Sequence, residues 1–230
     1  MRVEPHTVDS VVHAIKRGAR GLPIVRDNAD RVRFVRLLFY LNDEYRDEFW
    51  ERSVITLRTF ERPSHWPERR ALVHILAWTL MPNHFHLVLR PAIEGGVSKF
   101  MQRVCGSMTT HFNAKYDESG SIFQGSYRGR TADIHGDEYL RHLAVYVMVK
   151  NPFELFKGGI EMAIRNFDQA YAWAQAYRFC SLGEFTKKRE SPILERNIFV
   201  DLFGDSGQFK LFARDCMRYK LELLQQFVQV

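Results

Sequence analysis

The chain of 230 residues has few cysteines, no long apolar run and no internal repeat. Its three cysteines, Cys105, Cys180 and Cys216, are too few and too scattered for a disulfide framework or a cysteine-rich zinc site. No apolar stretch reaches the roughly 20 residues that span a bilayer, and the first residues lack the apolar block of a signal peptide. We therefore expect a cytoplasmic protein without a membrane partner.

What the chain does contain is the material for a globular core. Hydrophobic residues make up 46% of it and charged residues 26%. The 33 Lys and Arg residues exceed the 27 Asp and Glu residues, which gives a formal charge of +6. Such an excess invites a polyanionic partner, but it is also common on proteins that bind none. Composition therefore leaves the function open.

Hydrophobic periodicity predicts an alternation of strands and helices. We expect strands at 8–16, 72–80, 84–90 and 121–134, and helices at 27–48, 97–116 and 137–151, the last ending before Pro152. The order strand, helix, strand, strand, helix, strand, helix is that of an α+β fold with a ferredoxin-like antiparallel sheet, βαββαβ, and an added C-terminal helix.

The remaining segments predict additions to that unit. Residues 50–70, with two prolines and many Arg and Glu residues, predict an irregular insertion or a short edge hairpin. Residues 155–180 predict helices that pack around the sheet, and 187–192 predict a linker. We divide the chain into a catalytic domain at 1–180 and a small helical C-terminal extension at 181–230.

Two histidines on one predicted strand are the first candidates for chemistry. His84 and His86 alternate with Phe85, so both imidazoles point to one face of the sheet while Phe85 points into the core. With Cα atoms roughly 6 to 7 Å apart, the two rings can converge on one metal ion. The alternative is an exposed polar face. A Met-Pro-Asn turn directly before the pair favours a rigid site.

The third predicted helix supplies a candidate nucleophile. Tyr139, His142 and Tyr146 share one stripe of this helix. A tyrosine hydroxyl with a pKa near 10 is a weak nucleophile at pH 7. A metal that polarises a phosphodiester, together with a nearby base or cation, would make its attack feasible. The alternative is a partly buried tyrosine on an amphipathic helix.

Basic and aromatic side chains gather near these elements. Basic groups neutralise phosphates and exposed aromatic rings stack on unpaired bases, although a solvated surface is the alternative. The candidate DNA-binding residues are Arg17 and Arg20 in the first loop, Gln124, Tyr127, Arg128 and Arg130 around the fourth strand, and Lys150 on the third helix.

Five sequence blocks, in order, resemble one family. LMPNHFHLVLR at 80–90 resembles the His-hydrophobic-His block of the single-tyrosine HUH transposases, and the likeness is greatest to the REP-associated tyrosine transposases. The other blocks are VHAIKRG, FMQRV with HFNAKY, SGSIFQGSYRG and AVYVMVKNP. The likeness spans residues 8–155. Any single block would be weak, but five in the same order are specific.

The resemblance implies an activity and its parts. His84 and His86 would be two ligands of a divalent metal, Mg²⁺ or Mn²⁺. Tyr146 would attack a DNA phosphodiester and leave a 5′-phosphotyrosine and a free 3′-hydroxyl. The protein would then be a DNA strand transferase and endonuclease that acts on single-stranded or hairpin DNA. It would be nucleoid-associated, as a monomer or a homodimer.

One position departs from the family pattern. There the third ligand, Gln or Asn, lies one turn after the tyrosine, where this chain has Lys150. Asn151 lies five residues after Tyr146, about 140° around an ideal helix. A π-bulge between them would restore Asn151 as the ligand. Otherwise Lys150 approaches the phosphate as a cation, and the metal has two protein ligands and water.

Two other functions remain open at this point. A domesticated, catalytically weak relative would bind hairpin or single-stranded DNA without cutting it. An unrelated metal hydrolase would use the histidine pair but would leave the other four blocks unexplained. The sequence indicates neither the target DNA nor the role of residues 187–230.

Overall fold

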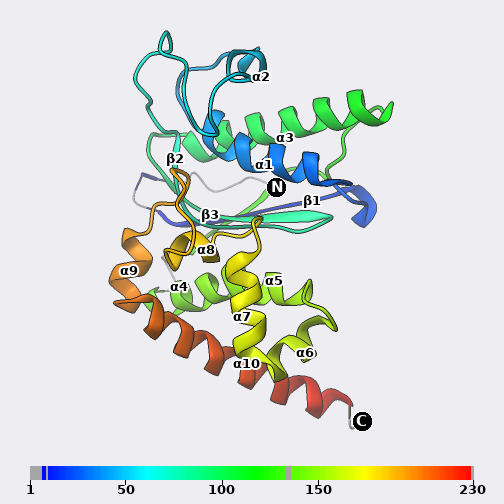
Figure 1. The fold of residues 1–230 in the computed structure, drawn as a ribbon, viewed down its shortest axis with the longest axis vertical. Helices are drawn as coiled ribbons and strands as arrows, with labels where there is room; N and C mark the ends of the chain where they lie inside the picture. Colours follow the sequence, from blue (N-terminus) through cyan, green and yellow to red (C-terminus); the bar gives the residue numbers. More distant parts are fainter. Residues whose placement is uncertain (1–6, 9, 133–135, 229–230) are drawn as a thin grey trace.

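A four-stranded antiparallel sheet forms the centre of the computed structural model, which describes residues 7–8, 10–132 and 136–228 (Figure 1). The strand order is β2-β3-β1-β4, with β3 antiparallel to β1 and β2, and β4 antiparallel to β1. This is the order of a ferredoxin-like sheet, so the predicted fold class is confirmed. The strands are β1 (Val12–Arg17), β2 (Val73–Leu80), β3 (His84–Pro91) and β4 (Arg128–Thr131).

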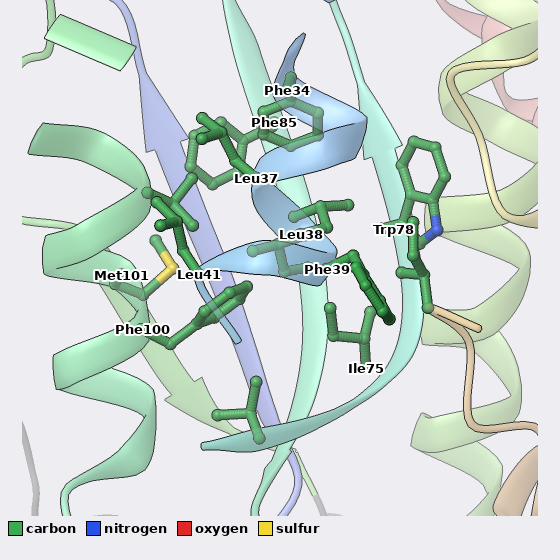
Figure 2. Packing of buried hydrophobic residues seen from close by; sticks show 14 of the residues in the cluster. Phe34, Leu37, Leu38, Phe39, Leu41, Ile75, Trp78, Phe85, Phe100 and Met101 are labelled. Atoms are coloured by element: carbon green, nitrogen blue, oxygen red, sulfur yellow. The ribbon is translucent and has the colours of Figure 1, made fainter. Parts of the chain in front are cut away.

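Two helices, α1 (Asn28–Tyr40) and α3 (Gly96–Tyr116), cover one face of the sheet (Figure 1). A capping box starts α1, because the Asp27 carboxylate accepts a hydrogen bond from the Asp30 amide at 2.9 Å. The helices bury their apolar stripes against alternate residues of the strands, as Figure 2 shows for part of this core. Its fully buried side chains include Phe34, Leu37, Leu38, Trp78, Phe85 and Phe100.

The other face of the sheet is covered by the helices that follow β4 (Figure 1). Together with Leu76, Ala77 and Val88 from the strands they form a second hydrophobic cluster. The long last helix packs against α4, α6 and α9. These helices are α4 (Gly136–Val145), α5 (Asn151–Glu154), α6 (Gly159–Arg165), α7 (Phe167–Ala176), α8 (Leu182–Phe185), α9 (Asn197–Phe203) and α10 (Ser206–Val228). None of the described helices is long and apolar enough to cross a membrane.

The first predicted helix is shorter than expected, because α1 ends at Tyr40 instead of continuing to Glu48. The cause is Asn42, which follows the end of the helix and whose side chain bonds the backbone at the start of β2. Its Oδ1 accepts hydrogen bonds from the amides of Leu72 and Val73, both at 3.0 Å, and its Nδ2 donates to the Val73 carbonyl at 2.8 Å. A polar residue that satisfies strand backbone in this way competes with helix continuation.

Two strands also differ from their predicted bounds. β1 starts at Val12, after a turn in which Ser10 bonds the Thr7 carbonyl, and it continues through Arg17, which we had placed in the loop. β4 is limited to Arg128–Thr131, because Phe123 turns into the core and Gly125 has a left-handed φ of 52°. Residues 9, 133 and 134 of the predicted strands lie outside the described residues.

The third predicted helix does not end before Pro152. α4 passes into a π-helix at Tyr146–Lys150 and then into α5, with Pro152 in its first turn. Proline is tolerated there because the amide it lacks is one that a helix start leaves unpaired. The prediction that the helix stops was therefore wrong, and the reason is the wider turn that precedes the proline.

The insertion at 50–70 is irregular, as predicted, with a single short helix, α2 (Trp50–Ser53), and no strand among its residues. Trp50 and Trp66 are buried against Tyr40, with ring centroids 5.1 and 6.3 Å away. The segment at 187–192 has no helix or strand, but Arg189 within it donates a hydrogen bond to the Cys180 carbonyl at 2.6 Å; its role as a linker stays a prediction. The boundary at residue 180 stays a prediction, although Phe199 and Phe209 are buried in the second cluster.

Candidate active site

The face of the sheet that α4 to α10 cover carries the candidate site. Because paired residues in antiparallel strands share a face, side chains from three strands stand side by side there. The rows across β3, β1 and β4 are His84–Arg17, His86–Ile15–Arg128 and Val88–His13–Arg130. The predicted orientation is confirmed, since Phe85 points to the other face and is fully buried in the α1/α3 core.

In each of the two predicted ligands, His84 and His86, the ring nitrogen Nδ1 takes part in a hydrogen bond. The Asn83 amide group donates from Nδ2 to the Gly21 carbonyl at 3.1 Å, so its Oδ1 is free to accept from His84 Nδ1 at 2.7 Å. His86 Nδ1 shares a hydrogen bond of 3.0 Å with His13 Nε2. The His84 and His86 rings are 4.9 Å apart. Both Nδ1 atoms are engaged, which directs the Nε2 atoms to a ligand.

Burial keeps these imidazoles neutral. His86 is 2% exposed, and burial followed by the nearby His13 lowers its pKa far below the ordinary value of 6.5. Burial, and then the charge of Arg130, lowers the pKa of His13 to about 4. Burial and the neighbouring Arg17 lower the pKa of His84 in the same direction. A neutral imidazole has the lone pair that a metal ion requires.

Tyr146 lies over this group of histidines at the end of α4. Its ring centroid is 5.3 Å from that of His86 and 6.0 Å from that of His13, edge-on in both cases. The side chain is 36% exposed, so a substrate can reach it. Lys150 Nζ lies 4.9 Å from the Tyr146 ring centroid and forms an ion pair of 2.5 Å with Glu154. The nucleophile candidate and a cation therefore share one surface.

The π-helix changes the spacing between Tyr146 and Asn151. The Asn151 amide donates to the Tyr146 carbonyl, five residues back instead of four. One wide turn thus separates the two residues, where an α-helix would place Lys150 one turn after Tyr146. The structure contains the π-turn that the interpretation of Asn151 required. Whether Asn151 binds a metal stays a prediction.

Side chains from outside the helix stabilise this wide turn. Pro152 has no amide to donate to the carbonyls behind it. The Thr79 hydroxyl on β2 donates instead to the Val147 carbonyl, and the Cys180 thiol lies 3.4 Å from the Met148 carbonyl as its donor. Both donors are fully buried. The local geometry of the helix that carries Tyr146 therefore depends on residues far away in the sequence.

Buried polar atoms without a partner mark the place of a possible ligand. Asn151 is 1% exposed, and neither its Oδ1 nor its Nδ2 has a hydrogen-bond partner; His86 Nε2 has none either. Each such atom costs about 1 to 3 kcal/mol when nothing satisfies it. Across the described ranges, no group of three His, Cys, Asp or Glu side chains is arranged to hold a metal. The Asn151 amide oxygen as a third protein donor stays a prediction.

A cavity of about 600 Å³ opens beside Tyr146. Its floor comes from β1 and β4, and its walls come from α4 and α10. The lining residues are His13, Ile15, Arg128, Arg130, Tyr139, His142, Leu143, Val145, Tyr146, Lys150, Cys216, Met217 and Tyr219. The predicted stripe of Tyr139, His142 and Tyr146 therefore faces one cavity.

Comparison with known proteins finds a similarity that includes this site. Residues 39–149, just under half of the chain, match the family model of IS200-like transposases. The matched segment contains both histidines and Tyr146 and ends before Asn151. A solved structure of a REP-associated tyrosine transposase bound to a REP hairpin is similar over 84% of this chain and 88% of that chain, with 12% identity and a TM-score of 0.44. No curated protein matches.

The predicted DNA-binding residues do not all lie together. Arg128, Arg130 and Lys150 line the cavity beside Tyr146. Arg17 lies across from His84 on β1. Tyr127 is away from this group, because its hydroxyl lies 3.1 Å from Ser98 Oγ on α3 and its ring packs against the α1/α3 core.

Two further predicted residues lie at the edge of the sheet. Arg20 is exposed in the turn after β1, in the short 3-10 helix Ala19–Gly21, with a left-handed φ of 55°. Gln124 is exposed, and its backbone amide bonds the Arg17 carbonyl at 2.9 Å. Neither of them lines the cavity.

Sequence reasoning missed one partner of the site and one wall of its cavity. The sequence predicts only that His13 lies on a strand, although its alternation with Ile15 puts it on the side where a partner strand carries His86. No signal in the sequence indicated that Cys216, Met217 and Tyr219 of α10 would come to the cavity.

Proposed function

We propose that this chain is a metal-dependent transposase that nicks and rejoins single-stranded or hairpin DNA through a 5′-phosphotyrosine. The match of residues 39–149 to the IS200-like family model supports a DNA transposase. The observation that carries the finer proposal is Tyr146, exposed at its edge and packed over His86 and His13. As a DNA-processing protein it would act in association with the nucleoid, as a monomer or a homodimer.

His84, His86 and Asn151 would hold the divalent cation. The fit rests on the orphaned His86 Nε2 and Asn151 amide atoms, and on the Asn83 contact that leaves His84 Nε2 with its lone pair. Imidazole suits Mn²⁺ better than Mg²⁺, which prefers oxygen ligands. When bound, the cation would polarise the phosphodiester and offset the charge that develops on its oxygens.

The side chains of this chain supply the nucleophile and the surrounding charge. The Tyr146 oxygen would attack the phosphorus, forming a tyrosine–phosphate bond as the bond between phosphorus and the 3′-oxygen breaks. The released oxygen takes a proton and becomes a 3′-hydroxyl, and the tyrosine proton leaves to solvent at the exposed edge. A second 3′-hydroxyl can reverse the step without ATP, because the phosphotyrosine keeps the bond energy.

Cations on three elements would bind the DNA around the scissile phosphate. Lys150 lies beside the Tyr146 ring, and Arg128 and Arg130 line the adjoining cavity. Arg17 follows on the other side, next to His84. Each contact with a phosphate releases condensed counterions, so binding would weaken steeply as salt concentration rises.

A binding module without cleavage activity is the second candidate. The observation that favours it is Lys150, which occupies the position four residues after Tyr146 and pairs with Glu154 instead of offering a metal ligand. Such a protein would use the same cations to hold hairpin DNA and would leave its phosphodiesters intact.

Covalent capture separates the two candidates. Purified protein is incubated with a single-stranded hairpin oligonucleotide and Mn²⁺, and denaturing gels are examined for a protein–DNA adduct. We expect an adduct with the natural protein and with Tyr45→Phe, a matched control at an exposed tyrosine outside the site, and none with Tyr146→Phe. An adduct that persists in Tyr146→Phe would contradict the nucleophile assignment.

Binding of the same oligonucleotides, measured at several salt concentrations, tests the binding module. Salt-sensitive binding without an adduct, for every hairpin tried, would favour the binding module. No binding of single-stranded DNA at low salt would contradict both candidates.

A further inference from the structure

None of the candidate metal ligands lines the cavity, which lies over the neighbouring strands. The histidines of the candidate metal site are on β3, whereas the floor of the cavity is formed by His13 and Ile15 on β1 and by Arg128 and Arg130 on β4. β1 separates β3 from β4 in the sheet. His84, His86 and Asn151 are absent from the cavity lining, while Tyr146 belongs to it. Whatever fills the cavity therefore touches the nucleophile but leaves the metal ligands free.

The lining has two chemically different parts. Guanidinium groups of Arg128 and Arg130 stand on the strand side. Apolar and aromatic side chains, among them Leu143, Met217 and Tyr219, stand on the helix side. A phosphate is neutralised by the first part, and the flat face of a base packs on the second. The volume of about 600 Å³ lies in the range of pockets that enclose a small ligand.

The wall that α10 provides is tied to the nucleophile helix. Cys216 Sγ lies 3.5 Å from His142 Nδ1, and the Phe212 ring is 5.2 Å from the His142 ring. His142 Nε2 in turn lies 3.0 Å from Glu138 Oε1, one turn earlier on α4. Met217 is buried in the cluster beneath this contact. The cavity is therefore preformed, and α10 is part of its construction.

We infer that this cavity binds one unpaired nucleotide directly next to the scissile phosphate, with its base against the α10 wall and its phosphate at Arg128 and Arg130. The inference rests on the proposed function, because Tyr146 is both the nucleophile and a lining residue. A nucleotide that fills the cavity must adjoin the phosphate that Tyr146 attacks. The helix α10, which lies outside the IS200-like segment, then contacts the base of the substrate.

Removing single bases tests the inference. Hairpin oligonucleotides carry one abasic residue at each position around the cleavage site, and the rate of adduct formation is measured for each. We expect one position next to the scissile phosphate to slow the reaction by about 5- to 150-fold, the range for loss of one stacked base. Tyr219 is exposed, so Tyr219→Ala spares the core. In this variant the same abasic residue should slow adduct formation by a smaller factor.

Filling the cavity with a larger side chain should reduce the advantage of intact DNA over abasic DNA. In Cys216→Phe the new ring occupies space meant for the base, so intact DNA should react more slowly and the abasic DNA should recover part of the rate. Leu211→Ala, on the exposed side of α10 and outside the cavity, is the control and should behave as the natural protein. The inference would be overturned if the abasic residue slowed adduct formation by the same factor in the natural protein, Tyr219→Ala and Cys216→Phe.

A binding measurement keeps this test separate from the test of cleavage. 2-Aminopurine replaces the base at each flanking position, and its fluorescence is recorded on binding to Tyr146→Phe, which forms no adduct. Quenching at one position that Tyr219→Ala or Cys216→Phe abolishes, and Leu211→Ala keeps, supports the pocket even if no hairpin is cut. Adducts without any such quenching would retain the proposed function and overturn the pocket.

Discussion

The two faces of the sheet use alternate residues of the same strands for different purposes. Toward α1 and α3, β1 and β3 present Val12, Ala14, Phe85, Leu87 and Leu89, all fully buried. Toward α4 and α10, the intervening positions on these strands are His13, Ile15, Arg17, His84 and His86. One face buries apolar side chains, which stabilises the fold. The other face carries the polar side chains of the candidate site, whose burial lowers stability.

Buried polar groups show the same difference. Beside α1, Asn42 satisfies β2 backbone with three hydrogen bonds, and Asp30 accepts from Lys115 and Tyr116. At the start of α5, the buried Asn151 side-chain amide has no partner. A buried polar group that is left unsatisfied lowers stability, and such groups persist where a ligand completes them. On α3, His111 Nε2 and Asn113 Oδ1 also lack a hydrogen-bond partner, so the contrast holds for Asn42 and Asp30 against Asn151 and not for every polar atom. We call the α1/α3 face the finished face, because the protein alone satisfies its Asn42 and Asp30 side chains.

The largest expected effect comes from a cavity in the finished face. Phe34 is fully buried on α1, with its ring 5.1 Å from Phe85. Phe34→Ala should lower the free energy of unfolding by about 3 to 5 kcal/mol. Denaturant unfolding measures this loss, and Mn²⁺ binding per folded molecule should stay unchanged. A comparable loss of Mn²⁺ affinity would show that the two faces are not independent.

Asn151→Leu should separate stability from function on the other face. The substitution replaces an orphaned buried amide by an apolar group of similar size, so the free energy of unfolding of the metal-free protein should rise by about 1 to 2 kcal/mol. Adduct formation should fall by about 100-fold, because the third protein donor is lost.

The matched variant for this test is Asn42→Leu, which removes an amide that is fully hydrogen-bonded. It should destabilise the protein and leave the reaction rate of the folded fraction intact. If Asn151→Leu destabilises the protein as Asn42→Leu does, then Asn151 is a structural residue and the metal has two protein ligands.

His13 is expected to act through His86 and not on the substrate. With His86 Nε2 turned to the metal, His86 Nδ1 would donate to His13 Nε2 across 3.0 Å. His13→Ala should therefore lower Mn²⁺ affinity by about 10- to 100-fold. Electron paramagnetic resonance of free Mn²⁺ measures this affinity without the reaction. His13→Gln, which keeps an acceptor, should restore part of it, and an unchanged affinity in His13→Ala would contradict the positioning role.

The sequence predicted those parts of the molecule that depend on local patterns. Strict alternation on one strand oriented His84 and His86, and helical spacing joined Tyr139 and Tyr146. The partner of His86 could not be predicted, because the register of β1 against β3 is a tertiary property. The π-turn was inferred only from the spacing of a family pattern. Its stabilising donor on β2, Thr79, is 68 residues away from the carbonyl that it bonds.

The smallest expected effect concerns the ion pairs of the finished face, where pH changes the outcome. Asp30 is 5% exposed. Burial acts to raise the pKa of its carboxyl, but hydrogen bonds from Lys115, the Arg26 amide and Tyr116 outweigh it and hold the pKa well below the usual 3.8. A carboxyl with a lowered pKa in the folded state binds fewer protons than in the unfolded state. Its contribution to stability is therefore present above about pH 4 and is lost as the pH falls below that value.

Asp30→Asn removes this contribution without removing the side chain. At pH 7 it should lower the free energy of unfolding by about 1 kcal/mol, because hydrogen bonds to a charged acceptor become bonds to a neutral one. The difference between the variant and the natural protein should shrink as the pH falls from 4 toward 2, since the Asp30 carboxyl of the unfolded natural protein then takes up a proton, which favours unfolding. Urea unfolding at a series of pH values measures both curves. Parallel curves over this range would mean that the Asp30 charge does not stabilise the face, and the contrast between satisfied and unsatisfied polar groups would then rest on Asn42 and Asn151 alone.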